Sequence, residues 1–168
     1  MKTKLRVFDF DETLVKTDST ITVKHSLSRS TTVLKPEEFA TYQALEGDIF
    51  DFSSFAQVSN PQAKRHDIVL KGMLDKADSD VVVLTARADN AQPALVQYIR
   101  NTYKGGDRVT VITLGSSDPY DKAMWIRNAI KERNYTDLYF CDDSWENCRA
   151  VGDVCHKLGL NKMKIQKL

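Results

Sequence analysis

Short apolar segments recur along the chain, and stretches with helical periodicity separate them. Apolar and β-branched residues fill segments 5–10, 81–84, 108–114 and 138–141. Runs of this length and character are typical of strands that are covered on both faces of a parallel sheet. Segment 163–168 has a weaker pattern of the same kind, and we expect it to form a short fifth strand.

Helices are predicted between these strands. Apolar side chains recur at helical spacing in segments 60–77, 91–103 and 118–133, and again from 144 or 145 onward. Asn60 and Pro61 favour a helix start, since Asn is a good cap and Pro fits the first helical position. Strands that alternate with helices imply right-handed crossovers. We therefore expect residues 1–168 to form a single α/β domain, a three-layer Rossmann-like fold with a parallel sheet.

Residues 19–58 have a different pattern. Ser19 to Lys35 alternates apolar and polar residues around a turn at 26–30, which predicts a β-hairpin. Pro36 and the two glutamates after it predict a helix that ends near Gly47. The phenylalanine-containing stretch 49–58 is compatible with core packing or with a lid. We expect 19–58 to form a small flap, or reduced cap, inserted after the first strand.

Composition narrows the class of protein. The chain has 168 residues, of which 28% are charged and 42% hydrophobic, and this balance indicates a soluble globular protein. It has no apolar run near ~18 residues and no signal-peptide pattern, so we expect a cytoplasmic protein without a membrane segment. The three cysteines are too few for a disulfide framework, and we expect buried free thiols.

The net charge of +1 gives no strong preference for nucleic acid, but it does not exclude a local basic patch. The predicted hairpin carries several basic side chains, which could reach a substrate over the site or could form an ordinary solvated surface. These residues are Lys24, His25, Arg29 and Lys35.

Polar side chains follow the predicted strands at the points where they end. Asp9 and Asp11 follow the first strand, Thr85 ends the second, and Asp142 and Asp143 follow the fourth. Ligand sites in parallel α/β sheets lie beyond the carboxyl ends of the strands. The sequence therefore predicts that these five side chains meet at one site.

This set of side chains favours a metal ion and a phosphate group. Asp9 and Asp11 are two residues apart, so in an extended segment both point the same way. Carboxylates held close together repel each other unless a cation lies between them. Oxygen ligands without a nearby His or Cys indicate Mg²⁺. The Thr85 hydroxyl and the Lys122 ammonium would add the donors that a phosphate requires. The candidate metal ligands are Asp9, Asp11, Asp142 and Asp143.

At such a site, Asp9 can act as a nucleophile and Asp11 as a general acid that protonates the leaving oxygen. The candidate catalytic residues are Asp9, Asp11, Thr85 and Lys122.

The sequence resembles the haloacid dehalogenase (HAD) superfamily of phosphohydrolases in four motifs that occur in the family's order. The first is Asp9-Phe10-Asp11-Glu12-Thr13, and the second is the strand Val81 to Thr85. The third is Lys122, and the fourth is Tyr139-Phe140-Cys141-Asp142-Asp143. Together they span nearly the whole chain. Asp11 argues against the dehalogenases of the superfamily, which lack an acid at that place.

The resemblance implies a role for each matched residue. Asp9 would attack phosphorus and bind Mg²⁺, and Asp11 would be the acid/base and offer its backbone carbonyl to the metal. Asp143 is the expected direct metal ligand, whereas Asp142 would orient Lys122 or a metal-bound water. Thr85, Ala86, Arg87 and Lys122 are the expected substrate-binding residues.

Two positions depart from the family pattern. Glu12 stands where many members have Gly, so the turn after the first strand must tolerate a side chain. Asn147 stands where some members have a further acid. The short insertion at 19–58 resembles the small caps that leave the site open to polymers or that oligomerise to close it. The chain also resembles compact members encoded by bacteriophages, and the phosphatase part of polynucleotide kinase–phosphatase enzymes is similar in layout.

Three functions are compatible with the sequence. The first is a Mg²⁺-dependent phosphomonoester hydrolase with an aspartyl-phosphate intermediate. Its substrate would be a phosphorylated small molecule, such as a nucleotide, or a nucleic-acid end. The second is a phosphotransferase of the same superfamily, and the third is a non-catalytic module that binds phosphate or nucleic acid. The sequence does not determine the oligomeric state.

Overall fold

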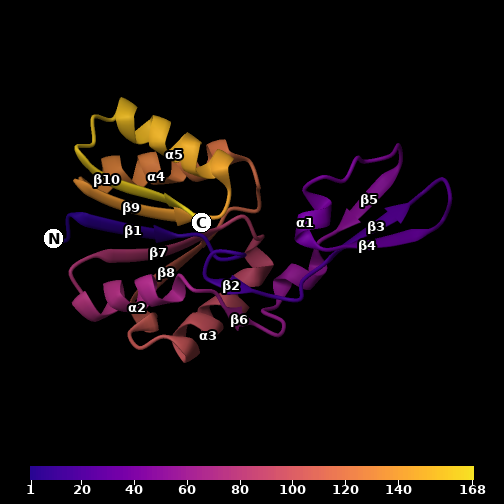
Figure 1. Cartoon of the computed structure of the whole chain (residues 1–168), viewed down its shortest axis with the longest axis horizontal. Helices are drawn as coiled ribbons and strands as arrows, with labels where there is room; N and C mark the ends of the chain where they lie inside the picture. Colours follow the sequence, from indigo (N-terminus) through magenta and orange to yellow (C-terminus); the bar gives the residue numbers. More distant parts are fainter.

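A five-stranded parallel sheet lies at the centre of the computed structural model, which describes residues 1–168 (Figure 1). The strand order is β10-β9-β1-β7-β8, and all neighbours are parallel. The strands are β1 (Lys4–Phe8), β7 (Asp80–Thr85), β8 (Val109–Thr113), β9 (Asp137–Asp142) and β10 (Lys162–Lys167). The predicted α/β fold and the weakly predicted fifth strand are both confirmed.

Helices cover both faces of the sheet, as expected for a three-layer fold (Figure 1). The helices of one layer are α2 (Asp67–Lys76) and α3 (Gln92–Thr102), and those of the other are α4 (Pro119–Arg133) and α5 (Trp145–Lys157). The central strand β1 serves both layers, because Phe8 packs toward α2 and α3 while Leu5 and Val7 pack toward α4 and α5. No helix is both long and apolar enough to cross a lipid bilayer.

Residues 19–58, which we call the cap, project from the end of the sheet at which the β1 segment ends (Figure 1). Their three strands form an antiparallel sheet in the order β4-β3-β5. These are β3 (Ile21–His25), β4 (Thr31–Leu34) and β5 (Asp48–Asp51), with the short helices α1 (Pro36–Phe39) and η1 (Ser53–Ala56). The predicted hairpin is the β3–β4 pair. Phe39 packs edge-on against Phe50 and Phe52, so the aromatic side chains pack within the cap.

Two short strands join the cap to the rest of the chain. β2 (Val15–Lys16) precedes the cap and β6 (Gln62–Ala63) follows it, and they pair with each other in antiparallel orientation. We call the rest of the chain, outside the cap, the core. Two further 3₁₀ helices, η2 (Asp89–Ala91) and η3 (Gly106–Arg108), belong to it.

The helix predicted from Asn60 starts later than expected. Asn60 has a left-handed backbone with φ of 47°, and the helix begins only at Asp67. The intervening strand β6 (Gln62–Ala63) pairs with β2, and the Lys64 N–H donates to the Leu14 carbonyl at 2.8 Å. A cap residue followed by proline is a local signal, and here the pairing with a distant strand overrides it.

The helix predicted for 36–47 is also shorter than expected, since it ends at Phe39. The Asp48 carboxylate accepts hydrogen bonds from the Leu45 N–H at 2.9 Å and from the Tyr42 hydroxyl at 2.7 Å. Short-range bonding of this kind by Asp favours turns over helix, and it holds the chain in a turn before β5.

Two exposed positions with left-handed backbones allow a stability prediction. Ala77 ends α2 with φ of 53°, and Gly159 follows α5 with φ of 68°, where an added methyl group would meet only open space. An L-residue pays roughly 1–2 kcal/mol in this region, whereas glycine does not. Ala77→Gly should therefore raise the free energy of unfolding by about 1 kcal/mol. Gly159→Ala should lower it by a similar amount, and urea unfolding of both variants measures the two changes. A destabilised Ala77→Gly protein would contradict this account.

Candidate active site

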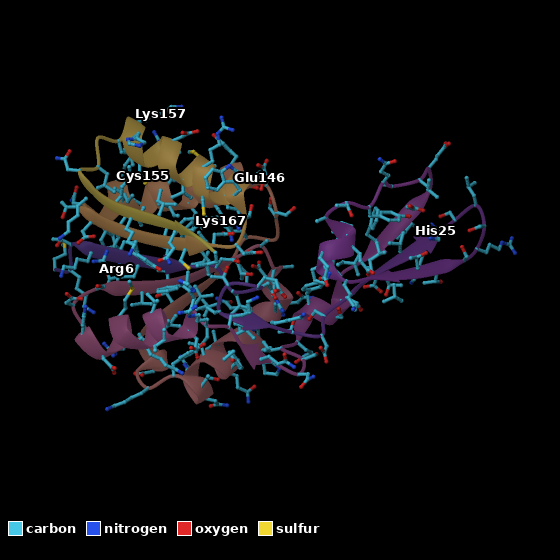
Figure 2. All side chains as sticks on the ribbon, in the orientation of Figure 1. Arg6, His25, Glu146, Cys155, Lys157 and Lys167 are labelled. Atoms are coloured by element: carbon cyan, nitrogen blue, oxygen red, sulfur yellow. The ribbon has the colours of Figure 1, made fainter.

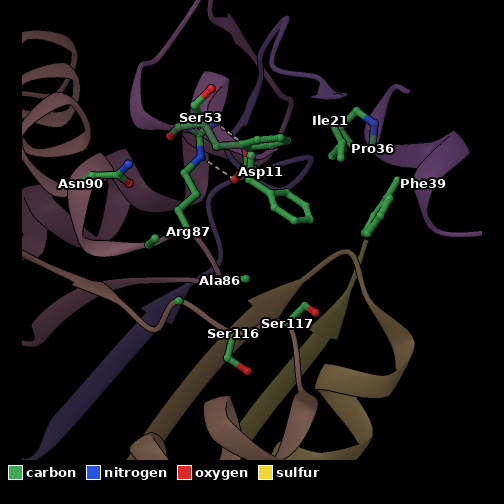
Figure 3. A pocket seen from close by; sticks show the side chains of 14 residues that line it. Asp11, Ile21, Pro36, Phe39, Ser53, Ala86, Arg87, Asn90, Ser116 and Ser117 are labelled. Atoms are coloured by element: carbon green, nitrogen blue, oxygen red, sulfur yellow. Dashed lines mark hydrogen bonds and ion pairs between the residues drawn. The ribbon is translucent and has the colours of Figure 1, made fainter. Parts of the chain in front are cut away.

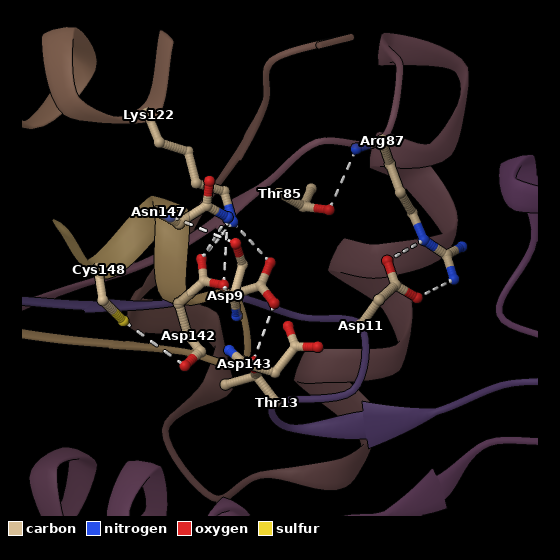
Figure 4. A network of polar contacts seen from close by, with 11 residues as sticks. Asp9, Asp11, Thr13, Thr85, Arg87, Lys122, Asp142, Asp143, Asn147 and Cys148 are labelled. Carbon is tan, nitrogen blue, oxygen red and sulfur yellow. Dashed lines mark hydrogen bonds and ion pairs between the residues drawn. The ribbon is translucent and has the colours of Figure 1, made fainter. Parts of the chain in front are cut away.

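The predicted site residues meet at the carboxyl ends of β1, β7 and β9 (Figure 4). A cavity of about 280 Å³ opens there, and its lining includes seven of the eight predicted site residues. These are Asp9, Asp11, Thr85, Ala86, Lys122, Asp142 and Asp143. The eighth residue, Arg87, lines an adjoining cavity.

Local sequence explains the position of Lys122. Asp118 caps α4 by accepting a hydrogen bond from the Tyr120 N–H, and Pro119 is the first residue of the helix. Lys122 is therefore in the first turn, and its buried ammonium bridges Asp9 Oδ1 at 2.8 Å and Asp142 Oδ2 at 2.7 Å. Burial disfavours the charge, but the two carboxylates outweigh it and raise the pKa of Lys122 above its ordinary value.

Asp142 is fully engaged by protein donors. Besides Lys122, its carboxylate accepts from the Ser144 N–H at 2.8 Å and from Asn147 Nδ2 at 3.0 and 3.2 Å. Burial and repulsion from Asp9 raise the pKa of Asp142, and Lys122 opposes that rise. These contacts suit a residue that orients Lys122, the role that the family resemblance implies for it. Asn147, the departure from the family pattern, helps to hold Asp142 in place.

Thr13 connects the first and fourth motifs, a role that the sequence analysis did not assign. Its buried hydroxyl donates to Asp9 Oδ2 at 2.9 Å and accepts from the Asp143 N–H at 3.1 Å. It therefore holds the two acidic segments in register with each other. The threonine that ends the Asp-x-Asp-x-Thr motif was the available signal.

The turn after β1, which carries Asp11 and Thr13, contains one residue with a strained backbone. Glu12 adopts a left-handed conformation with φ of 59°, a region that glycine enters without strain, so this turn tolerates a side chain as the sequence required. Its carboxylate pairs with Lys64 at 3.2 Å, on the chain segment that returns from the cap.

Three carboxylates converge where a metal ion would fit. One carboxylate oxygen of each of Asp9, Asp142 and Asp143 lies within 4.8 Å of the other two. Because the Asp142 oxygens already accept hydrogen bonds from the protein, Asp9 and Asp143 are the candidates for direct metal contact. Lys122 balances one of the three negative charges, so two remain. Burial and the charges of Asp9 and Asp142 raise the pKa of Asp143 to about 7. A hard divalent cation suits this oxygen-only set of ligands, which has an excess of negative charge. The Asp11 side chain is outside the cluster, which leaves its backbone carbonyl as the expected metal contact.

Asp11 faces Arg87 and not Lys122 (Figure 4). The guanidinium of Arg87 donates to both carboxylate oxygens of Asp11, from Nε at 2.9 Å and from Nη2 at 2.7 Å. Burial raises the pKa of Asp11, and the hydrogen bonds and charge of Arg87 counteract part of that rise. The guanidinium that the sequence analysis expected to bind substrate is thus bonded to a catalytic candidate.

A larger cavity of about 870 Å³ adjoins the carboxylate site where the cap meets the core (Figure 3). Apolar side chains of the cap form one wall, and short polar loops of the core form the other. The apolar residues are Ile21, Pro36, Phe39, Phe52 and Phe55. Asp11 lines both cavities, so it lies at their junction.

The basic side chains of the hairpin are not part of either cavity. His25 lies in the part of the cap far from the sheet (Figure 2). Its Nδ1 bonds Asp48 at 2.6 Å and its Nε2 bonds Thr32 at 2.8 Å, so it serves to hold the cap strands together. All three cysteines are free and buried, as predicted.

Comparison with known proteins finds similarity in structure only. No protein-family model matches the sequence, and no curated protein matches it. The HAD domain of the Legionella pneumophila effector protein Lem4 superposes with a TM-score of 0.58 and 13% identity, over 98% of this chain and 85% of that chain. The L. pneumophila effector Ceg4 superposes with a TM-score of 0.56 and 14% identity, over 99% of this chain and 86% of that chain.

At this identity the similarity shows the fold alone, and that fold is the HAD-like one that the motifs predicted. The similarity extends over nearly the whole chain, the cap included. The likeness to bacteriophage enzymes remains a prediction, because these structural neighbours are bacterial effectors.

Metal binding can be tested by thermal unfolding. Mg²⁺ at about 100 times its Kd should raise the Tm of the wild type by roughly 5–10 °C, since ligand binding stabilises the folded state. Asp143→Asn should lose most of this shift. Without Mg²⁺, the same variant should melt at a higher temperature than the wild type, because it removes a charge that Asp9 and Asp142 repel.

The matched control is Asp153→Asn on the exposed side of α5, which should keep the Mg²⁺ shift of the wild type. An unchanged Mg²⁺ shift in Asp143→Asn would contradict the proposed metal position.

Proposed function

We propose that this protein is a Mg²⁺-dependent phosphomonoester hydrolase that works through a phosphorylated Asp9. The observation that carries the proposal is the buried network in which Lys122 bridges Asp9 and Asp142, with Asp143 beside it and Asp11 at the junction of two cavities. The HAD-like fold supports the proposal by analogy only.

The smaller cavity suits the phosphoryl group. The Thr85 hydroxyl and the Lys122 ammonium line it together with Asp9, so donors and nucleophile surround the same space. The Asp9 carboxylate and Asp143, with the backbone carbonyl of Asp11, would hold Mg²⁺. When bound, the ion would neutralise charge on the carboxylates and on the phosphoryl oxygens.

The reaction has two steps. In the first, an Asp9 oxygen forms a bond to phosphorus while the ester P–O bond breaks, and the leaving oxygen takes a proton from Asp11. In the second, a water molecule gives a proton to Asp11 and its oxygen attacks phosphorus. The P–O bond to Asp9 then breaks, which releases inorganic phosphate and restores both aspartates.

The larger cavity suits a leaving group with a flat apolar part. Phe39, Phe52 and Phe55 line it, and Asp11 lies between it and the phosphoryl site. Aromatic side chains stack well against planar rings. The nucleotides and nucleic-acid ends considered from the sequence carry such a ring in the base, as do aryl phosphates, so we propose a phosphomonoester of this general class.

Asp9→Asn tests the nucleophile. The variant should lose Mg²⁺-dependent hydrolysis of an aryl phosphate by at least about 10³-fold, because the amide cannot form the acyl-phosphate bond. Release of inorganic phosphate measures the rate and also distinguishes hydrolysis from transfer to an acceptor alcohol.

Asp153→Asn is the matched control, because Asp153 is on the exposed side of α5 and outside both cavities, so the variant should hydrolyse the ester at the wild-type rate. Equal rates for the wild type and Asp9→Asn would refute the proposed function.

Phe52→Ala tests the leaving-group cavity. The truncation should raise KM about 10-fold for phosphates with an aromatic leaving group, since a ring contact is worth roughly 1.5 kcal/mol. It should leave KM for glycerol phosphate nearly unchanged. Ile49→Ala, at an exposed cap position outside the cavity, should alter neither value. A parallel rise in KM for both substrates would argue against an aromatic subsite.

A further inference from the structure

Arg87 has a partner for every N–H group that it carries. Nε and Nη2 donate to the two oxygens of Asp11, and Nη2 also donates to Thr17 Oγ1 at 3.3 Å. Nη1 donates to the backbone carbonyls of Phe55 and Gln57, each at 2.7 Å. A guanidinium has five N–H donors, so none is left for a phosphate. Only 3% of the side chain is exposed.

The partners belong to two different parts of the molecule. Asp11 follows the central strand β1 of the core, whereas Phe55 and Gln57 are at the end of the cap, in and just after η1. The guanidinium carbon also lies 5.4 Å from the centre of the Phe10 ring of the core and 5.2 Å from that of the Phe55 ring of the cap. One buried cation therefore joins the cap to the carboxylate at the junction of the two cavities.

The geometry of the ion pair fixes Asp11 more tightly than a single hydrogen bond would. Two parallel N–H···O bonds hold both the position and the plane of a carboxylate. Each carboxylate oxygen has a second lone pair that the guanidinium does not use, so Asp11 keeps a site for a proton. A free Asp side chain at the mouth of a cavity would instead sample several rotamers.

We propose that Arg87 is a positioning residue that makes the orientation of Asp11 depend on the cap segment 55–57. The inference rests on the proposed function, in which Asp11 protonates the leaving oxygen. A leaving group that enters the larger cavity contacts the cap, and the cap holds Arg87, which holds Asp11. Binding of the leaving group and its protonation are thus coupled through one side chain.

Leaving-group dependence tests this role directly. The alkoxide of an alkyl phosphate requires a proton in order to leave, whereas the dinitrophenolate of a dinitrophenyl phosphate leaves without one. Arg87→Met should lower kcat/KM for the alkyl ester by about 10²-fold or more, the contribution of a positioned general acid. It should lower kcat/KM for the activated ester by less than about 5-fold, because this ratio reports the first step and not the later attack of water, in which Asp11 takes a proton for both esters. Asp11→Asn should show the same pattern, and the double variant should be no slower than Asp11→Asn alone, since the two residues act as one unit.

Arg87→Lys provides a variant that keeps the buried charge in case Arg87→Met folds poorly. A lysine cannot make the two parallel bonds, so it should reproduce the selective loss on the alkyl ester. Arg6→Met is the matched control. Arg6 bonds Asp137 at 2.7 Å in a similarly shielded ion pair, in the core and far from the cap (Figure 2), and its loss should leave the ratio of the two rates unchanged.

Amide hydrogen exchange tests the connection from the side of the cap. Asp11→Asn weakens the hold on the guanidinium, so exchange at residues 55–58 should become at least several-fold faster, although Asp11 itself has no bond to the cap. Arg87→Met should accelerate the same amides, and Arg6→Met should not. A merely local role of Asp11 would leave these amides unchanged.

The outcomes separate the role of Arg87 from the proposed function. A wild type that hydrolyses neither ester overturns the proposed function, and the role of Arg87 with it. An active wild type with equal losses on both esters in Arg87→Met and Arg87→Lys overturns the role of Arg87 alone. Additive losses in the double variant, or unchanged exchange at 55–58 in Asp11→Asn, also overturn it.

Discussion

The buried ammonium of Lys122 is the interaction on which the rest of the site depends. Asp9 and Asp142 lie side by side at the ends of the adjacent parallel strands β1 and β9, because Phe8 of β1 is in register with Cys141 of β9. Two carboxylates at this separation in a buried setting would repel each other and lose their hydration. Lys122 reaches both carboxylates from the first turn of α4, and its single positive charge lies between them and offsets one of their two negative charges. The strand order, the start of α4 and the turn after β1 all serve to bring these three groups together.

Much of this arrangement is encoded locally, and that part could be predicted from the sequence. Apolar runs identify the five strands, and the carboxyl ends of parallel strands must share one edge of the sheet, so Asp9, Thr85 and Asp142 had to be neighbours. Lys122 was predicted as the match to the third motif of the family resemblance. What the sequence did not reveal depends on partners distant in the chain. Thr13 gains its role only because the segment after β9 presents the Asp143 N–H to it.

Local sequence predicted the cap only in part. Its hairpin follows from alternating residues, but α1 ends early where Asp48 makes a short-range turn, and α2 starts late because the segment before it pairs with the distant strand β2. The family resemblance implied that Arg87 would bind substrate. Its actual partners include two backbone carbonyls of the cap, and backbone carbonyls carry no side-chain identity from which a pairing could be predicted.

The pairing of β2 with β6 has a consequence for how such a protein can change. Because Val15 pairs with Ala63 and Lys16 with Gln62, the chain leaves the core and re-enters it at the same place. An insertion whose two ends are adjacent imposes no separation on the flanking strands, and such sites tolerate changes in length. The ladder thus allows the segment between residues 17 and 61 to change in length while Lys122, Asp9 and Asp142 keep their contacts. A replacement segment would still have to supply the two backbone carbonyls that hold Arg87.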